Sequence, residues 1–463
     1  MDRRRSLLRV SVALALSSGC INGPNYHKPA VATPSAYRGG SSAPAVASFG
    51  DQKWWDIFQD DALRELIRAA LQQNYDVRIA AARIVEARAQ LGITRADQLP
   101  EVGAQASVVS QRTPQVAGRP ALETSPTQLS LSFGWELDFW GKFRRATESA
   151  RAALFSQEWA QRQIVSSLVS DVASAYFQLR AQDLELEISR QTLASRTDSL
   201  RLTSLLADRG ATSMLDVRQA EQLVFGAGAT IPDLERSIEQ QENFISILVG
   251  KNPDSIVRGR TLVDQPRPPQ IPEGLPSSLL ERRPDILQAE QQLIAANAQI
   301  GVAKAQYFPQ ISLTAAGGVQ SSALTRLFSG PAGLWTLGAS ALQPVFEGGR
   351  IRNTVKVAEA RTEAATLIYQ RTVQEAFREV SDALVAYRKS QEVRLQQEQL
   401  TKAAEDATRL SNMRYRGGAA SYLEVLDGET RLFSARLALA EAELRELQSL
   451  VQIYRSLGGG WQQ

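Results

Sequence analysis

The sequence has one cysteine, Cys20, and one histidine, His27, among 463 residues. A single cysteine excludes an internal disulfide and a cysteine metal cluster. A histidine metal site or a Ser-His-Asp triad would rest on His27 alone. The formal charge is +3, and residues 1–19, with four arginines against Asp2, carry all of that excess. The rest of the chain is balanced, which argues against a nucleic-acid-binding protein with its clustered basic excess.

Long hydrophobic runs are also lacking, because no stretch of 18 or more apolar residues exists. An α-helix needs about 20 predominantly apolar residues to cross a bilayer, so a transmembrane helix is excluded on length. If the chain spans a membrane, it must do so as a closed β-barrel, since lipid leaves backbone groups no other way to be satisfied.

The first 19 residues have the layout of a bacterial secretory signal peptide. A basic stretch, Arg3–Arg5, precedes a short apolar run over residues 10–16. Three small residues, 17–19, then stand directly before Cys20. We therefore expect residues 1–19 to be removed in the mature protein.

Small residues before a lone cysteine resemble a lipobox, in which the cysteine is acylated and becomes the mature N-terminus. The match departs from the usual pattern, because Ser17 stands where leucine is usual and Arg9 shortens the apolar run. The alternative is an ordinary signal peptide with an incidental cysteine. We expect lipidation at Cys20 and an extended linker over residues 20–60, since residues 30–50 are rich in Ala, Ser, Gly and Pro.

An internal repeat organises the chain. The segment Ala89–Pro100 recurs as Ala298–Pro309, and Ser213–Val217 recurs as Ser421–Val425. A duplicated unit of about two hundred residues is hard to explain by chance. We predict a first repeat over residues 61–250, an inter-repeat linker over 251–276 and a second repeat over 277–458.

Each repeat contains a very long helix. Neither glycine nor proline occurs between Lys142 and Asp208 or between Arg350 and Arg416. At a rise of 1.5 Å per residue, each helix would reach roughly 100 Å, which no ordinary globular core needs. Apolar positions follow heptad-like spacing, which is typical of a coiled-coil seam; examples are Ile164, Leu168, Val172, Ala175 and Leu179, and Phe377, Val380, Leu384 and Tyr387.

Strand-like segments precede each long helix. From Leu129 to Phe139, apolar and polar residues alternate with period two over the length of a tilted membrane strand. We predict strands at about 101–113, 127–139, 310–320 and 333–346. Aromatic residues gather near their ends, as in the interfacial girdle of an outer-membrane barrel; they are Trp135, Phe139, Trp140, Tyr307, Phe308, Trp335 and Phe346.

Four strands cannot close a membrane barrel, because small barrels need about eight or more. An open sheet edge inside lipid leaves backbone groups unpaired. The strands of several chains must therefore combine. Two chains would supply eight strands and three would supply twelve.

The chain resembles the TolC-like outer-membrane factor family, in its lipid-anchored OprM/NodT branch. The resemblance runs from the signal peptide to the C-terminus. Its motifs are Cys20 with Pro24-Asn-Tyr26, Trp54-Trp55, Trp135-Glu-Leu-Asp-Phe-Trp-Gly141, Leu279-Leu-Glu-Arg-Arg-Pro-Asp-Ile286, Phe308-Pro-Gln-Ile-Ser-Leu-Thr314, Tyr415-Arg-Gly-Gly418, Tyr422-Leu-Glu-Val-Leu-Asp427 and Leu457-Gly-Gly-Gly-Trp461.

This resemblance implies a mostly α-helical homotrimer with a twelve-stranded outer-membrane β-barrel, a long periplasmic helical barrel and a small mixed α/β equatorial region. It implies the exit duct of a tripartite efflux system, lipid-anchored in the outer membrane with a large periplasmic part. The expected partners are outer-membrane lipid, a periplasmic adaptor and an inner-membrane pump of the resistance-nodulation-division type. The duct would use no cofactor and bind no nucleic acid.

The resemblance also places a gate at the periplasmic helix tips. Leu423 and Asp427 match the family's aperture ring, and both lie on one helix face. The family carries an arginine three residues after the aspartate, whereas here that position is Thr430 and Arg431 follows it. The ion-pair part of the gate is therefore open, and Asp427 could instead be a solvated surface carboxylate.

Arg431 and Asp216 are further candidates near the gate. Asp216 follows Leu215 in the equivalent turn of the first repeat. If the aperture is not at Leu423 and Asp427, this turn is the next place to expect it.

Two other classes of function compete with a channel. A periplasmic coiled-coil scaffold or adaptor without a pore would explain the helices and the anchor, but not the alternating strands. An enzyme could use Glu136 and Asp138 as paired carboxylates, although two residues on the polar side of one strand need no catalysis to explain them. We predict that the protein is not an enzyme.

Overall fold

The computed structural model describes residues 22–38, 48–115, 118, 120–268, 271–322 and 324–461. Cys20 and the expected signal peptide, residues 1–19, lie outside the described residues. The chain forms two compact units. Unit 1 comprises Met1–Ala30, Arg83–Glu158 and Gln288–Gln370, and unit 2 comprises Val31–Ala82, Trp159–Leu287 and Arg371–Gln463.

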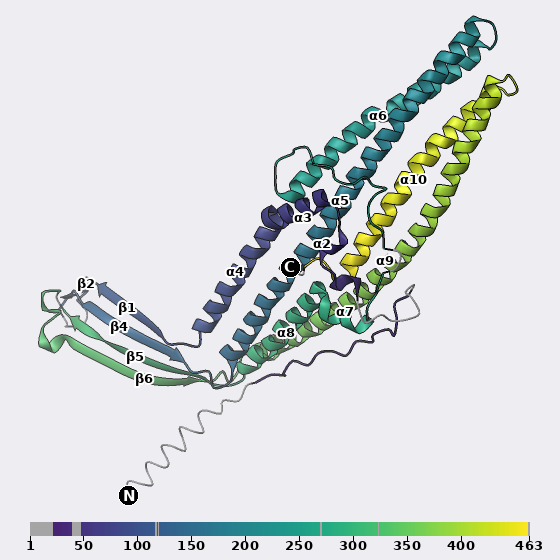
Figure 1. The fold of residues 1–463 in the computed structure, drawn as a ribbon. Helices are drawn as coiled ribbons and strands as arrows, with labels where there is room; N and C mark the ends of the chain where they lie inside the picture. The colour runs from purple at the N-terminus through teal and green to yellow at the C-terminus, as the bar shows by residue number, and fades with distance from the viewer. Residues whose placement is uncertain are drawn as a thin grey trace. The chain divides into compact units, whose positions relative to one another are not determined.

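A four-stranded antiparallel sheet dominates unit 1. Its order is β1-β4-β5-β6, with β1 at Glu101–Val108, β4 at Thr127–Glu136, β5 at Gln310–Ser321 and β6 at Gly333–Leu342. Figure 1 shows the four strands side by side, two from the first half of the sequence and two from the second. The central pair is in register over ten residues, with Leu131 opposite Gly317.

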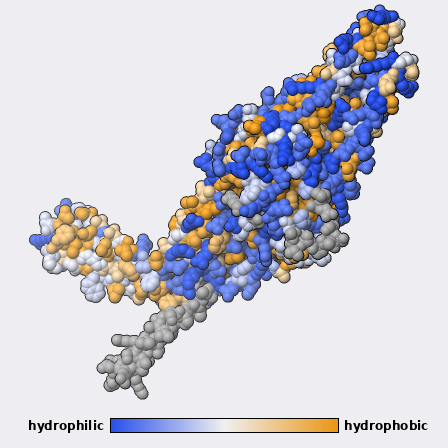
Figure 2. Space-filling model, in the orientation of Figure 1, coloured by the Kyte–Doolittle hydropathy of each residue, from blue (hydrophilic) through white to orange (hydrophobic). Residues whose placement is uncertain are grey.

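Large apolar side chains stand on the exposed surface of this sheet. Trp335 and Leu337 on β6 are 80% and 79% exposed, and Leu131 on β4 is 60% exposed. In Figure 2, hydrophobic residues gather over the strands. Such a surface is costly in water, so these side chains require an apolar environment or a protein partner.

The strands are shorter than the alternating sequence pattern predicts. The strand expected at 127–139 ends at Glu136, because the Asp138 carboxylate accepts from Phe143 N (3.1 Å) and Arg144 N (2.9 Å) and caps helix α5, Lys142–Asp208. The strand expected at 333–346 ends at Leu342. Pro344 lacks the N–H that would continue the ladder.

The segment expected as one strand at 101–113 is divided in two. After β1, residues 109 and 110 interrupt the ladder, and β2 (Gln111–Thr113) pairs with β3 (Leu122–Thr124) as a separate ribbon. The segment predicted as one strand therefore takes part in two separate ladders, β1 with β4 and β2 with β3.

The helical part of unit 1 comes from segments of four helices: α4 (Tyr75–Ala96), α5, α8 (Pro284–Ala305) and α9 (Arg350–Arg416). Their contacts there include a small apolar cluster of Ile300, Ala303, Val355 and Ala358. Residues 22–25 lie against α5: the buried guanidinium of Arg145 donates to Asn22 O (3.2 Å) and to Asn25 Oδ1 (2.8 Å).

Unit 2 contains η1 (Phe49–Asp51), α2 (Trp54–Ile57), α3 (Asp61–Gln73), α6 (Met214–Val249), α7 (Pro276–Arg282) and α10 (Tyr422–Ser456), with parts of α5 and α9. Two short helices, η2 (Leu324–Arg326) and η3 (Gly330–Ala332), belong to unit 1. The largest fully buried side chains of unit 2 form its core; they include Leu63, Ile67, Tyr176, Leu179, Ile245, Leu447, Ile453 and Tyr454.

The linker expected over residues 20–60 is partly folded. Phe49 and Phe58 both pack edge-on against Tyr454, with ring centroids 5.8 Å and 6.1 Å apart. Burial of these aromatic rings outweighs the Ala-, Ser- and Pro-rich composition of the preceding residues. The extended segment therefore ends before η1, rather than at residue 60.

A helical stretch near the start of each half of the chain is broken once. Asn74 separates α3 from α4, and its side-chain oxygen accepts from Asp76 N (2.8 Å) and Val77 N (3.2 Å). Arg283 separates α7 from α8, because a residue before proline avoids the helical region.

The two long helices α5 and α9 occupy the spans without glycine or proline, with 67 residues each. Among the described residues, no helix is long and apolar enough to cross a membrane. The mostly helical chain with a four-stranded antiparallel sheet confirms the expected fold class in its coarse form.

Candidate functional site

Two helix turns in unit 2 carry the residues expected near the gate. Helix α9 ends at Arg416, and Gly418 adopts a left-handed conformation (φ +70°) that lets the chain reverse into α10. Helix α5 ends at Asp208, and Gly210 (φ +72°) does the same before α6. Glycine suits both positions because it has no Cβ to clash there. Figure 1 shows both turns at the same end of this unit.

The residue that opens α10 packs inward, and its neighbour points outward. Tyr422 is buried beside Val425 and Ala220, and its ring lies 5.4 Å from that of Tyr415. Burial raises the pKa of Tyr422 to about 12. Leu423, the next residue, is 60% exposed. An exposed leucine on a helix turn is free to contact another chain or to face an aqueous opening.

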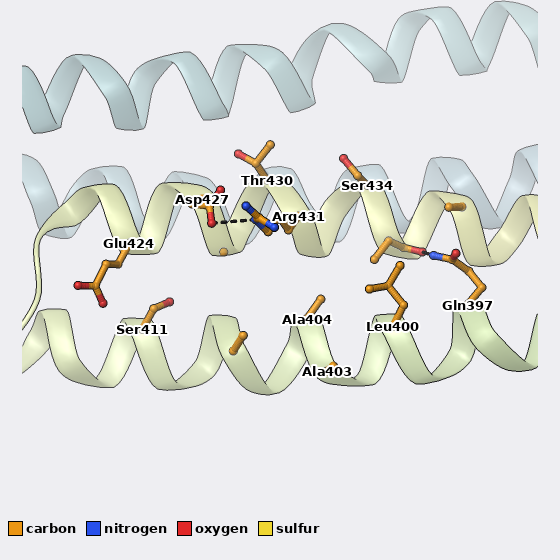
Figure 3. Close-up of a pocket in the computed structure, with 14 residues that line it drawn as sticks. Gln397, Leu400, Ala403, Ala404, Ser411, Glu424, Asp427, Thr430, Arg431 and Ser434 are labelled. Atoms are coloured by element: carbon orange, nitrogen blue, oxygen red, sulfur yellow. Dashed lines mark hydrogen bonds and ion pairs between the residues drawn. The ribbon is translucent and has the colours of Figure 1, made fainter.

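Asp427 and Arg431 form an ion pair on the surface of α10. Asp427 Oδ2 accepts from Arg431 Nε at 2.8 Å, and the pair spans one helical turn. Figure 3 shows this contact. Both side chains are largely exposed, so the pair adds little to stability. It does, however, place a cation beside the carboxylate in this chain.

Asp216 has a different local role from Asp427. Its carboxylate accepts from Thr212 Oγ1 and from Ser213 N, while its own N–H donates to Ser213 Oγ (3.3 Å). This is a capping box at the start of α6. The residue that matches Asp216 in the second turn is Glu424, which pairs with Arg414 at 3.2 Å. The structure therefore brings Asp427 and Arg431 together and holds Asp216 at a helix end.

A groove runs along α9 and α10 beside the ion pair. It encloses about 730 Å³, and Asp427 and Arg431 stand among its lining residues. Figure 3 shows Ala403, Ala404 and Leu400 on the α9 side. Small side chains line much of the groove; they are Ala403, Ala404, Ala407, Ala435 and Ala438.

A buried arginine near these turns was not predicted. Arg196 on α5 is 4% exposed; its Nη1 donates to Leu223 O on α6 (2.9 Å), and its Nη2 donates to Glu429 O on α10 (3.3 Å). The guanidinium also lies over the Phe433 ring, 5.0 Å from the centroid, and Arg196 Nε lies 3.9 Å from Glu429 Oε2. Burial lowers the pKa of Arg196, and the nearby Glu429 opposes that effect.

The heptad seam of α5 could have revealed Arg196. Alternating steps of three and four residues from Leu179 reach Ser189 and Arg196, and all three are buried. A charged residue at a seam position needs partners inside the helix assembly.

The carboxylates considered for catalysis have structural partners instead. Glu136 pairs with Lys142 (3.0 Å) and accepts from Gln310 Nε2 (2.5 Å). Asp138 caps α5 and pairs with Arg144 (3.3 Å). The arrangement gives each carboxylate its own cation.

A sequence model of a known family matches both halves of the chain. The family, described as outer membrane efflux protein, matches residues 66–251 and 275–459. This chain belongs to the outer membrane efflux protein family. The predicted resemblance to outer-membrane factors is thereby confirmed, whereas the lipid-anchored branch stays a prediction.

Curated relatives cover nearly the whole chain. A probable efflux pump outer membrane protein of Pseudomonas putida, TtgC, is 37% identical over 99% of this chain and 96% of its own length. The cation efflux system protein CusC of Escherichia coli is 33% identical over 99% of both chains. These relatives confirm that this chain is an outer-membrane efflux protein of a Gram-negative bacterium, with a periplasmic part.

Solved structures show the same fold. The outer-membrane channel OprN matches with a TM-score of 0.89 and 32% identity, over 96% of this chain and all of that one. The open-state channel MtrE of Neisseria gonorrhoeae matches with a TM-score of 0.86 and 30% identity, over 96% of this chain and 99% of that one. These channels share the chain's sheet and long helices, so the scaffold without a pore is the wrong interpretation.

Proposed function

We propose that this chain is the exit duct of a tripartite efflux system, through which small molecules pass from the periplasm to the outside. Membership of the outer membrane efflux family over both halves of the chain carries the proposal. Relatives are named for antibiotic, toluene and cation efflux. The cargo class that fits all of them is small molecules and ions, rather than folded proteins.

The working unit is a homotrimer. Within the described sheet, β1 and β6 are the end strands, and each has a partner on one side only. Three chains joined edge to edge supply twelve strands and remove every open edge, which a lipid environment demands. The exposed Trp335 and Leu337 on β6 then face lipid.

The two halves of the chain are a duplication in this proposal. Helices α4 and α8 have 22 residues each, and α5 and α9 have 67 residues each. Each half also supplies two strands of the sheet. A repeat of this kind gives the trimer six similar helix pairs around one bore.

The gate lies at Leu423 and Asp427 on α10. Threefold symmetry would bring three copies of each residue to one constriction, with an apolar ring one turn from an acidic ring. A narrow apolar ring can close a pore by dewetting, and an acidic ring favours cations. Arg431 beside Asp427 weakens that cation preference, because it partly neutralises each carboxylate.

The partners are a periplasmic adaptor and an inner-membrane pump, of the resistance-nodulation-division type. Their presence follows from the names of the relatives, which are outer-membrane components of efflux pumps. Cys20, outside the described residues, would carry the lipid anchor. The ordered contacts of Asn22 and Asn25 with Arg145 support an anchor attached close to the folded body.

A deletion strain tests the function. Loss of the gene should raise cellular accumulation of at least one compound in a panel of antibiotics, solvents and metal ions, and the plasmid-borne wild-type gene should restore efflux. Native mass spectrometry of the purified protein should show three copies. Unchanged accumulation of every compound, or a stable monomer in the membrane, would contradict the proposal.

A further inference from the structure

Helix α6 contains three helix-weakening residues in a short stretch that the helix nonetheless runs through. Gly226, Gly228 and Pro232 all lie inside Met214–Val249. The matching residues of α10, aligned through Ser213 with Ser421, are Ser434, Arg436 and Ala440. The second repeat therefore carries a regular helix where the first carries a weak one.

Packing within the chain does not require either glycine. A Cβ added at Gly226 would meet nothing within 4 Å, and one at Gly228 would meet only Leu193 Cδ1, at 3.9 Å. By contrast, a Cβ at Gly428 of α10 would lie 3.3 Å from Thr408 Cα. Gly428 is thus explained by the close approach of α9. Gly226 and Gly228 add only backbone freedom, since glycine lowers helix stability relative to alanine.

Pro232 removes one hydrogen bond from the same stretch. It has no N–H, so the carbonyl of Gly228 has no partner four residues on. The Thr230 hydroxyl also donates to Ala227 O (2.8 Å), and such a contact competes with the helix ladder. Pro232 is exposed on the surface of the single chain, so packing within the chain does not account for it.

The part of α6 that precedes this stretch is hydrogen-bonded to α5, and the same arginine of α5 is hydrogen-bonded to α10. Arg196 donates to Leu223 O, three residues before Gly226, and to Glu429 O on α10. A displacement of the α5–α6 turn would therefore carry residues 214–223 with it. The nearest backbone able to absorb that displacement is the weak stretch itself.

We propose that residues 226–232 form a hinge at which the α5–α6 pair bends when the helix tips open. When two packed helices bend together, the helix on the outside of the bend must span a longer arc than the helix on the inside. The backbone of one of the two helices must therefore deform. Helix α5 has no glycine or proline, whereas α6 has all three weak positions close together. The hinge rests on the proposed gating function. Because Arg196 joins α5 and α6 to Glu429 on α10, the first-repeat pair must bend with the helix that carries Leu423 and Asp427 when that helix moves.

Hydrogen exchange measured on the detergent-solubilised trimer tests the hinge directly. Amides in peptides covering residues 224–236 should exchange about tenfold faster than those in peptides covering 432–444, because a missing hydrogen bond eases local opening. Pro232→Ala restores the N–H and is smaller than proline, so it should slow exchange in the first region. Equal protection of the two regions in the wild type would overturn the hinge.

Channel recordings in planar bilayers test whether the hinge affects opening of the channel. Gly226→Ala with Gly228→Ala, and separately Pro232→Ala, should lower the open probability by about two- to fivefold, as expected when a compatible backbone is stiffened. Gly92→Ala in α4 is the matched control, because a Cβ there also meets nothing within 4 Å. Wild-type opening in both stiffened variants would overturn the proposal.

Two further outcomes separate the possible failures. If the glycine variant no longer forms trimers, a neighbouring chain needs those glycines, which overturns their part in the hinge. If the wild-type gene fails to restore efflux in the deletion strain, the proposed function itself has failed. Uniform hydrogen exchange with normal efflux would overturn the hinge alone.

Discussion

Arg196 on α5 donates a hydrogen bond to the main-chain carbonyl of Glu429 on α10, at 3.3 Å. The same guanidinium donates to Leu223 O on α6. One buried side chain thus joins three helices close to the turns, and it does so mainly through backbone carbonyls, which persist whatever side chains stand at those positions.

Arg196→Ala should destabilise the protein by about 2–4 kcal/mol, because it leaves Glu429 and two carbonyls without their buried partner. It should also loosen the helix tips and make cells more sensitive to large antibiotics such as vancomycin. Arg190→Ala is the control: Arg190 lies on the same helix but forms an exposed pair with Glu235. If Arg196→Ala matches Arg190→Ala in thermal unfolding and in drug sensitivity, Arg196 does not hold the three helices together.

Leu423→Ala with Asp427→Ala should raise single-channel conductance and lower cation preference, because bulk and charge both leave the proposed constriction. Arg431→Ala alone should raise cation preference, since it leaves Asp427 without its neighbouring cation. Arg409→Ala breaks a similar exposed pair with Asp406 on α9 and serves as the control. If conductance and ion preference stay unchanged in both gate variants, Asp427 is a solvated surface carboxylate.

Glu443 on α10 should make stability depend on pH. Burial raises the pKa of Glu443 above its ordinary value of 4.5, opposed by Arg267 and Arg394 and assisted by Glu398 and Glu446. The folded state therefore holds this proton more tightly than the unfolded state does. The group's stabilising contribution is complete below about pH 4.5 and is lost as the pH rises through its folded pKa.

Glu443→Gln should consequently be more stable than the wild type at neutral pH and should flatten this part of the profile. Thermal unfolding between pH 4 and pH 8 measures both effects. Glu375→Gln is a suitable control, because Glu375 is exposed on α9 and pairs only loosely with Arg371, at 3.7 Å. A profile unchanged by Glu443→Gln would show that another group titrates.

Mass spectrometry of the mature protein should find a diacylated Cys20 at its N-terminus. Ile21 follows the cysteine in place of an aspartate, which fits sorting to the outer membrane. Cys20→Ala should weaken anchoring, while the strands still hold the trimer in the membrane. An unmodified N-terminus at another residue would exclude the anchor.

The extent of the long helices followed from the sequence alone. Residues 142–208 and 350–416 lack glycine and proline, and α5 and α9 fill those spans. Nothing local can end a helix inside such a span, and the glycines after it supply the left-handed turn. The antiparallel strands followed from period-two alternation, because one face of each strand must differ from the other.

Only the tertiary structure determined where the strands end and which side chains become partners. The strand after Leu129 stops at Glu136 because Asp138 caps the next helix, and Phe49 and Phe58 are ordered because Tyr454, some 400 residues away, receives them. The partners of Arg196 come from α6 and α10, which are distant in sequence. Asp216 and Asp427 both follow a glycine-containing turn, yet one caps a helix and the other pairs with Arg431. The side chains specify local geometry, but which donor meets which acceptor depends on where the helices pack.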